Sequence, residues 1–209
     1  NIKYDLCCRD QACDDSDKRP YVVRFKIPDN IENVTFTDLI RGTITIARDQ
    51  LDDFIIARSD GSPVYNFVVV IDDAAMKINY VIRGEEHLGN TVKQILLYEA
   101  LGFEQPAWAH LPLILNPEGG KLSKRDGAVS VVEYKKDGYL PDALLNYLVR
   151  LGWSHGDQEV FTREELIKFF SLNAVGSSGA IFDIEKLDWL NGVYIRSMSA
   201  DDLLSYIEN

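Results

Sequence analysis

The sequence contains no apolar run of 18 or more residues, which is about the length that a helix needs to cross a bilayer. We therefore expect no membrane-spanning segment. The chain begins Asn1-Ile2-Lys3-Tyr4-Asp5, without an initiator Met and without an apolar signal segment. Such a start is typical of a piece of a longer chain, with a processed mature protein as the alternative.

Positive charge is scarce. The chain has 22 Lys and Arg residues against 33 Asp and Glu residues, which gives a net charge of −11. Nonspecific affinity for nucleic acid comes from clustered Lys and Arg, so this net charge argues against a general phosphate-binding surface. A nucleic-acid partner is not excluded, because a local basic loop can act on an acidic body.

Cysteine is equally sparse, and Cys7, Cys8 and Cys13 all lie in the first segment. A zinc site needs a fourth ligand, and the nearest histidine is His87. Adjacent cysteines suit no common pair of zinc ligands. We therefore expect no structural zinc, and an odd cysteine count without a secretion signal indicates cytoplasmic thiols.

What is present is an ordinary globular composition, with 209 residues of which 46% are hydrophobic and 26% charged. This length predicts one or two domains. The pattern changes twice along the chain, and we place soft boundaries near residues 60 and 130. The resulting regions are 1–60, 61–130 and 131–209.

The first region is predicted to be rich in strands. Alternating or β-branched segments cover residues 21–27, 34–39, 43–47 and 54–57. Asp60-Gly61-Ser62-Pro63 is a strong turn signal that ends the region.

The second region predicts a strand–helix–strand unit. Residues 80–84 and 111–115 are expected to be strands, and residues 90–101 a helix that stops at Gly102. The continuous apolar run 65–71 fits either a buried strand or a buried helix. Strand, helix, strand is the unit of a parallel sheet, where ligands bind beyond the carboxyl ends of the strands. Residues 83–86 and 116–125 follow the two strands, so a site is expected there.

The third region is predicted to be helical. Ser130 can cap a helix over 131–136, and Pro141 stands at the start of a helix that covers 142–151. Thr162 and Glu165 form a capping-box pattern that opens a helix over 164–170. Residues 184–190 and 201–207 complete the set.

The sharpest local feature is the segment Gly119-Gly120-Lys121-Leu122-Ser123-Lys124-Arg125-Asp126-Gly127. Flanking glycines let a loop approach a ligand closely, and its three cations suit an oligophosphate on which negative charge develops. The spacing is not that of a Walker A loop. Taken alone, the segment also fits a solvated basic turn.

Lys121-Leu122-Ser123-Lys124-Arg125 resembles the KMSKS loop of class I aminoacyl-tRNA synthetases, in the KLSKR form usual for glutamyl enzymes. Three further segments, 60–67, 81–87 and 143–158, resemble bacterial glutamyl-tRNA synthetases in the same order, and the resemblance is weakest before residue 20. It implies an α/β fold: the second half of a Rossmann-like catalytic domain in 61–130. Part of a β-rich acceptor-end-binding insertion precedes it in 1–60, and a helical stem-contact region follows in 131–209.

The resemblance also implies roles for the residues of the loop. Lys124 is expected to hold the phosphates of ATP, with Lys121 and Arg125 assisting and Ser123 donating a hydroxyl. A lysine is a point charge on a flexible stem, so it can follow a moving phosphate.

Four more residues receive roles from the same resemblance. Tyr65 matches the tyrosine that recognises the glutamate side chain, and Arg83 matches the arginine that contacts the amino acid. Glu86 falls on the nucleotide side, and Ile114 falls where the backbone meets adenine. The implied substrates and partners are L-glutamate, tRNA(Glu) and ATP with Mg²⁺, in a cytoplasmic monomer.

Other interpretations of these residues stay open. Tyr65 also fits ordinary core, and Arg83 could pair with Asp72 or Asp73. Glu85 and Glu86 fit a solvated helix start. A further set, His87, His110 and His155, is expected to be structural. The resemblance implies ATP-dependent attachment of glutamate to tRNA(Glu) through a glutamyl-adenylate. This adenylation needs no catalytic base, because the substrate carboxylate is itself the nucleophile on the α-phosphorus of ATP, so catalysis consists of positioning and charge stabilisation.

The sequence departs from the family in lacking the HIGH motif, the neighbouring groups of the glutamate pocket and the anticodon-binding domain. We therefore expect a fragment that is inactive alone, with an exposed sheet edge and an uncovered apolar face. Two rival functions remain: a noncatalytic tRNA-binding or assembly module, and the paralogue that glutamylates queuosine in tRNA. Arg125 and the long C-terminal helical region argue against the paralogue.

Overall fold

The computed structural model describes residues 4–11, 19–123 and 130–208. The chain divides into two compact units, residues 1–110 and residues 111–209. Among the described residues, no helix is long and apolar enough to cross a membrane.

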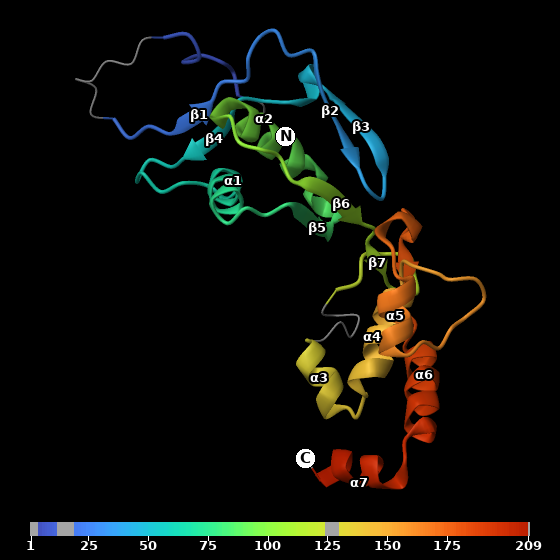
Figure 1. Ribbon diagram of the computed structural model, residues 1–209. Helices are drawn as coiled ribbons and strands as arrows, with labels where there is room; N and C mark the ends of the chain where they lie inside the picture. The colour runs from blue at the N-terminus through green and yellow to red at the C-terminus, as the bar shows by residue number, and fades with distance from the viewer. Residues whose placement is uncertain (1–3, 12–18, 124–129, 209) are drawn as a thin grey trace. The chain divides into compact units, whose positions relative to one another are not determined.

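The first unit contains a four-stranded sheet in the order β3-β2-β6-β5 (Figure 1). β2 and β3 form an antiparallel hairpin that turns at residues 39–41, and β2 pairs with β6 in parallel. A second, two-stranded sheet joins β1 to β4 in antiparallel pairing. The strands are β1 (Val23–Phe25), β2 (Asn33–Asp38), β3 (Gly42–Ala47), β4 (Phe54–Ala57), β5 (Tyr80–Gly84) and β6 (Ala107–Leu111).

Two helices complete this unit, α1 (Tyr65–Ala75) and α2 (Leu88–Leu101), with the 3₁₀ turns η1 (Arg48–Gln50) and η2 (Glu85–His87). α2 is the better buried helix, since Val92 and Ile95 to Tyr98 are all at most 2% exposed. These residues form a core with Val34 and Phe36 of β2, Phe54 of β4 and Val70 of α1. Within the described residues, β5 is an edge strand, and its Tyr80 and Ile82 side chains are exposed.

The apolar run 65–71 is therefore helical. The run has no hydrophobic periodicity that would distinguish a helix from a strand. Packing against α2 and β4 selects the helix. The predicted strand 111–115 is wrong in its position. The strand β6 ends at Leu111, and β7 begins only at Ile114. Pro112 lies between them and has no N–H for a strand ladder.

The second unit is mainly helical (Figure 1). Its elements are β7 (Ile114–Leu115), α3 (Val131–Lys136), α4 (Pro141–Arg150), α5 (Arg163–Phe169), η4 (Leu172–Ala174), β8 (Ala180–Ile181), α6 (Ile184–Ser197) and α7 (Ala200–Glu208). The short strands β7 and β8 pair in parallel. Tyr134, Leu144, Tyr147, Leu187 and Leu190 form its core.

The predicted helix starts of this unit are confirmed. Pro141 occupies the first turn of α4. Thr162 accepts a hydrogen bond from the Glu165 N–H, and the Glu165 carboxylate accepts one from the Thr162 N–H, which completes the capping box of α5. Ser130 stands at the N-cap of α3 but makes no capping hydrogen bond through its side chain. α6 runs seven residues beyond the predicted end at Leu190, through Gly192 to Ser197.

Candidate functional site

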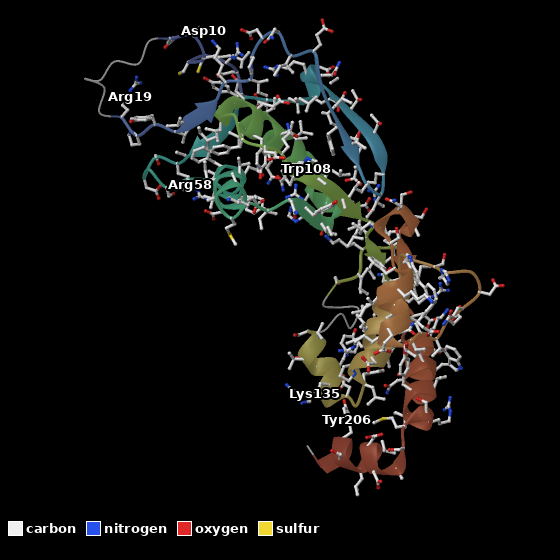
Figure 2. All side chains as sticks on the ribbon, viewed as in Figure 1. Asp10, Arg19, Arg58, Trp108, Lys135 and Tyr206 are labelled. Atoms are coloured by element: carbon white, nitrogen blue, oxygen red, sulfur yellow. The ribbon has the colours of Figure 1, made fainter. Side chains whose placement is uncertain are left out.

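Arg83 lies near the carboxyl end of the edge strand β5 and is held by neutral groups. Its Nη2 donates to the Thr91 hydroxyl at 2.6 Å and to Gln94 Oε1 at 2.8 Å. Its Nε lies 3.3 Å from His110 Nε2. The ring of Trp108, labelled in Figure 2, lies 5.6 Å from the guanidinium carbon and adds a cation–π contact. Four side chains from α2 and β6 thus fix the direction of one cation.

The alternative pairing of Arg83 with Asp72 or Asp73 is not what the structure shows. Within residues 4–11, 19–123 and 130–208, no Asp or Glu oxygen forms an ion pair with its guanidinium. Asp73 acts on it only through a longer-range field. Burial lowers the pKa of Arg83 below its ordinary value, and the neighbouring Tyr65 hydroxyl and the Asp73 carboxylate oppose that shift. An arginine remains a cation at neutral pH, so its partly buried positive charge has no direct counter-ion in the part of the chain that the structure describes.

Tyr65 is the first residue of α1 and lies beside Arg83. Its hydroxyl interacts with the guanidinium, and its ring centroid lies 6.3 Å from that of His87. Tyr65 is 51% exposed, so it is not a core residue. The structure therefore brings together the two residues predicted to bind glutamate, with a hydroxyl and a cation side by side.

The region directly after β5 forms the 3₁₀ turn η2, which contains Glu85 and Glu86. Glu85 forms an ion pair with Arg41 of the β2–β3 turn, so it is not simply solvated. Glu86 is exposed, and its carboxylate folds back over Gly84, so that a Cβ at position 84 would collide with Glu86 Oε2. Glu86 thus lies within the turn that follows Arg83.

A second group of predicted residues lies in the other unit. The Leu122 N–H donates to the Ile114 carbonyl at 2.9 Å, and the Asn116 N–H donates to the Gly120 carbonyl at 2.7 Å. These bonds close a hairpin that places Lys121 opposite Leu115. Gly119 has a φ of +84°, which a side chain would strain. The hairpin therefore fixes the start of the basic loop directly beside Ile114.

Ile114 is 37% exposed, and Lys121 is also exposed. An exposed apolar side chain next to a lysine and the Ser123 hydroxyl offers contacts for a flat ring and for phosphates. Lys124 and Arg125, the other two predicted loop residues, lie outside the described residues. The structure thus brings together Ile114, Lys121 and Ser123 in one unit, and Tyr65, Arg83 and Glu86 in the other.

Sequence reasoning missed three of the four buried residues behind Arg83 and named the fourth, His110, only as structural. Asp38, Thr91, Gln94 and His110 are each at most 1% exposed. One signal was available for Asp38: it stands in phase with the core residues Val34 and Phe36 on β2, and a buried carboxylate demands hydrogen-bond partners. Its partner His110 is 72 residues away, so the sequence could not name it.

No group of three or more His, Cys, Asp or Glu side chains within the described part of the chain is arranged to hold a metal ion. Cys7 and Cys8 are exposed, with their sulfur atoms 3.4 Å apart. A hydrogen bond to Asp5 is the main cause that raises the pKa of Cys7 to about 11, which disfavours the thiolate that a metal would need. Cys13 lies outside the described residues.

Comparison with known proteins places this geometry in a family. Residues 3–189 match the family of class I tRNA synthetases (E and Q), catalytic domain. The chain is 56% identical over 197 residues to a glutamate–tRNA ligase of Syntrophotalea carbinolica, covering 93% of this chain and 41% of the relative. It is 55% identical over 202 residues to the corresponding ligase of Geobacter sulfurreducens, covering 96% and 43%.

Solved structures agree with these relatives. A crystal structure of a glutamate–tRNA ligase from Elizabethkingia meningosepticum, in complex with its amino acid, aligns with a TM-score of 0.81 and 42% identity. It covers 90% of this chain and 41% of that one, so the chain spans about two fifths of the length of its relatives. The family match covers most of the chain and the identities are far above 30%, and the chain therefore belongs to the class I tRNA synthetases of the E and Q group, within their catalytic domain.

Proposed function

We propose that this chain is part of a glutamate–tRNA ligase, which joins L-glutamate to tRNA(Glu) through a glutamyl-adenylate. The reaction consumes ATP and releases AMP and pyrophosphate, with Mg²⁺ on the phosphates of the nucleotide. The relatives named above support this activity. The proposed protein acts as a cytoplasmic monomer, and the residues described here supply part of its machinery.

The observation that carries the proposal is the state of Arg83. A partly buried guanidinium without a direct counter-ion among the described residues is costly unless an anion reaches it. The Tyr65 hydroxyl beside it supplies a donor to the same anion. Carboxylates accept such paired donors well, so we assign the glutamate-binding role to Tyr65 and Arg83.

The hairpin of the second unit supports the nucleotide-binding role. At Ile114 the backbone would meet adenine, and Lys121 and Ser123 offer a cation and a hydroxyl to phosphate. We assign Lys124 and Arg125 to the same role from the loop sequence, and Glu86 to the nucleotide side. The work of the three cations is to stabilise the negative charge that grows as pyrophosphate leaves.

The chemistry requires no proton acceptor from the protein. A glutamate α-carboxylate is already ionised at neutral pH and attacks the α-phosphorus of ATP directly. Positioning and charge stabilisation therefore suffice. This agrees with a site in which the groups proposed to meet the substrate are the Tyr65 hydroxyl and the Arg83 guanidinium, neither of which is a proton acceptor at neutral pH.

The test is amino-acid-dependent exchange of pyrophosphate into ATP, with tRNA(Glu) present, measured on the full-length gene product. We expect exchange with glutamate and not with glutamine or aspartate. In the same assay, Lys124→Ala should lower kcat strongly and leave the KM for glutamate nearly unchanged. Exchange that is absent with glutamate, or equal for all three amino acids, would overturn the proposed function. An unchanged kcat in the variant would remove Lys124 from the mechanism.

A further inference from the structure

The groups around Arg83 form a continuous buried hydrogen-bond network that no predicted role uses. Asp38 of β2 and His110 of β6 are 1% and 0% exposed. The His110 Nδ1 lies 2.6 Å from Asp38 Oδ2, and its Nε2 lies 2.9 Å from the Thr91 hydroxyl and 3.3 Å from Arg83 Nε. One imidazole ring thus connects a buried carboxylate to the cation of the site.

The protons of this network can be placed from donor and acceptor chemistry. Asp38 Oδ1 accepts the backbone N–H groups of Ile40 and Arg41 at 3.0 and 2.9 Å, so the carboxylate is ionised and acts as acceptor only. Burial raises the pKa of Asp38, but the hydrogen bonds from His110 and these backbone groups outweigh it, and the net pKa is lowered. The short contact to Oδ2 then requires the proton of His110 to be on Nδ1.

A neutral ring with its proton on Nδ1 presents a bare Nε2 to Arg83. That nitrogen has one lone pair, which can accept the single hydrogen of Arg83 Nε while the Thr91 hydroxyl donates to the His87 carbonyl at 3.3 Å. The other tautomer would turn an N–H toward the guanidinium N–H and the contact would become repulsive. The carboxylate of Asp38 therefore decides whether His110 accepts the Arg83 Nε–H, while Thr91 and Gln94 hold Nη2 with either tautomer.

We infer that His110, set in its Nδ1–H tautomer by Asp38, is a positioning residue that fixes the guanidinium of Arg83 for the amino-acid substrate. The expected effect on glutamate binding rests on the proposed function, whereas the hydrogen bonds between Asp38, His110 and Arg83 do not depend on it. His110 contacts Arg83 and acts on the substrate only through it.

Two isosteric variants separate the two ends of the imidazole. In His110→Asn the amide nitrogen occupies the place of Nδ1, so it keeps the bond to Asp38 and leaves Arg83 Nε without an acceptor. In His110→Gln the amide reaches the place of Nε2, so its oxygen accepts from Arg83 while the bond to Asp38 is lost. A third variant, Asp38→Asn, keeps the Oδ1 acceptor of the turn and allows the ring to adopt the other tautomer.

The first measurement is steady-state pyrophosphate exchange by the full-length gene product with tRNA(Glu) present. We expect His110→Asn and Asp38→Asn to raise the KM for glutamate about tenfold, the ratio expected when a hydrogen bond to a charged group is lost. The KM for ATP should stay within about twofold. His110→Gln should have the smaller effect on the KM for glutamate. Equal effects of the Asn and Gln variants, or a parallel change in both KM values, would overturn the inference while leaving the proposed function intact.

The second measurement needs neither a variant nor an active enzyme. Nitrogen-15 NMR of histidine side chains in the wild-type protein at neutral pH should show His110 with a protonated Nδ1 and an unprotonated Nε2. The Arg83 Nε–H should exchange slowly with solvent. A protonated Nε2 on His110, or a rapidly exchanging Arg83 Nε–H, would refute the positioning role whatever substrate the protein uses.

Discussion

Asn146 of α4 offers the sharpest stability prediction, because one buried amide joins three segments of the second unit. It is fully buried. Its Oδ1 accepts the Phe161 N–H at 2.7 Å and the Tyr194 hydroxyl at 2.8 Å, and its Nδ2 donates to the Glu159 carbonyl at 3.0 Å. Removal of this side chain should therefore loosen both the 157–162 loop and the packing of α6.

The magnitude for Asn146→Ala follows from these bonds. The Tyr194 hydroxyl has a second acceptor in the Phe161 carbonyl, so the loss of its hydrogen bond to Asn146 is compensated. The other two bonds contribute about 1 kcal/mol each, and the orphaned Phe161 N–H, in a residue that is 1% exposed, costs about another 1 kcal/mol. We expect the free energy of unfolding to fall by about 3 kcal/mol.

Urea denaturation with peptide-resolved hydrogen exchange measures this loss and locates it. Asn191→Ala is the matched control, because Asn191 also bridges backbone groups, the Leu140 N–H at 2.9 Å and the Gly138 carbonyl at 3.2 Å, but water can reach its partly exposed side chain. The control should cost about 1 kcal/mol. A smaller loss for Asn146→Ala than for Asn191→Ala, or unchanged exchange of the Phe161 amide, would contradict the reasoning.

Three further predictions follow from single contacts. Tyr65→Phe should raise the KM for glutamate about tenfold in pyrophosphate exchange with little change in the KM for ATP, because one donor to a carboxylate is lost; a larger rise for ATP would reassign Tyr65. Thr162→Ala should lower the free energy of unfolding by about 1 kcal/mol in urea titrations, since its side chain caps α5, whereas Ser130→Ala, at a cap without a side-chain bond, should cost only a few tenths. Equal losses would argue against the capping box. Burial lowers the pKa of His110 below its ordinary 6.5, with Arg83 and Arg41 acting in the same direction and Asp38 opposing. The unfolded chain then binds the proton more readily, so wild-type stability should decline as pH falls below about 6.5, and His110→Gln should lose that part of the slope. A slope that survives the substitution would assign it to other groups.

Local signals in the sequence predicted much of this fold. Thr162 and Glu165 marked the start of α5 because a capping box is satisfied by groups only three residues apart. The strands β2 and β3 were predicted over 34–39 and 43–47 from their local composition, and the structure pairs them in a hairpin around Gly42, which has a φ of +74°. Elements determined by near neighbours could therefore be read directly.

Elements whose conformation depends on distant residues could not be predicted in this way. The run 65–71 has no period, and its helical state depends on packing against α2, which starts at Leu88. Most of the strand β6 was not predicted. Its residues Trp108 to His110 are buried by contacts with residues far along the chain, such as Asp38. The α/β fold class, by contrast, was confirmed by the family match.

The candidate site likewise contains residues that the sequence identified and residues that only the fold brings together. Tyr65, Arg83 and Ile114 were identified by resemblance, and their roles remain proposals that the assays above decide. The hydrogen bonds behind Arg83 were invisible in the sequence, because Asp38, His110 and Gln94 meet only in the folded sheet. A motif marks the groups that face a ligand, whereas the groups that hold them in place are scattered.

The neutral groups that hold Arg83 have a physical consequence for the proposed recognition of an acidic substrate. If a carboxylate held Arg83, a ligand would have to compete with a charge-assisted bond about twice as strong as a neutral one. Thr91, Gln94 and His110 instead fix the guanidinium with neutral acceptors and leave its charge available. The negative charge of Asp38 is kept one imidazole ring away, where it selects the tautomer without neutralising the cation. Direct contact of Asp38 with Arg83 would satisfy both groups better and would weaken the site, so the interposed histidine is what reconciles a stable fold with a cation ready to bind.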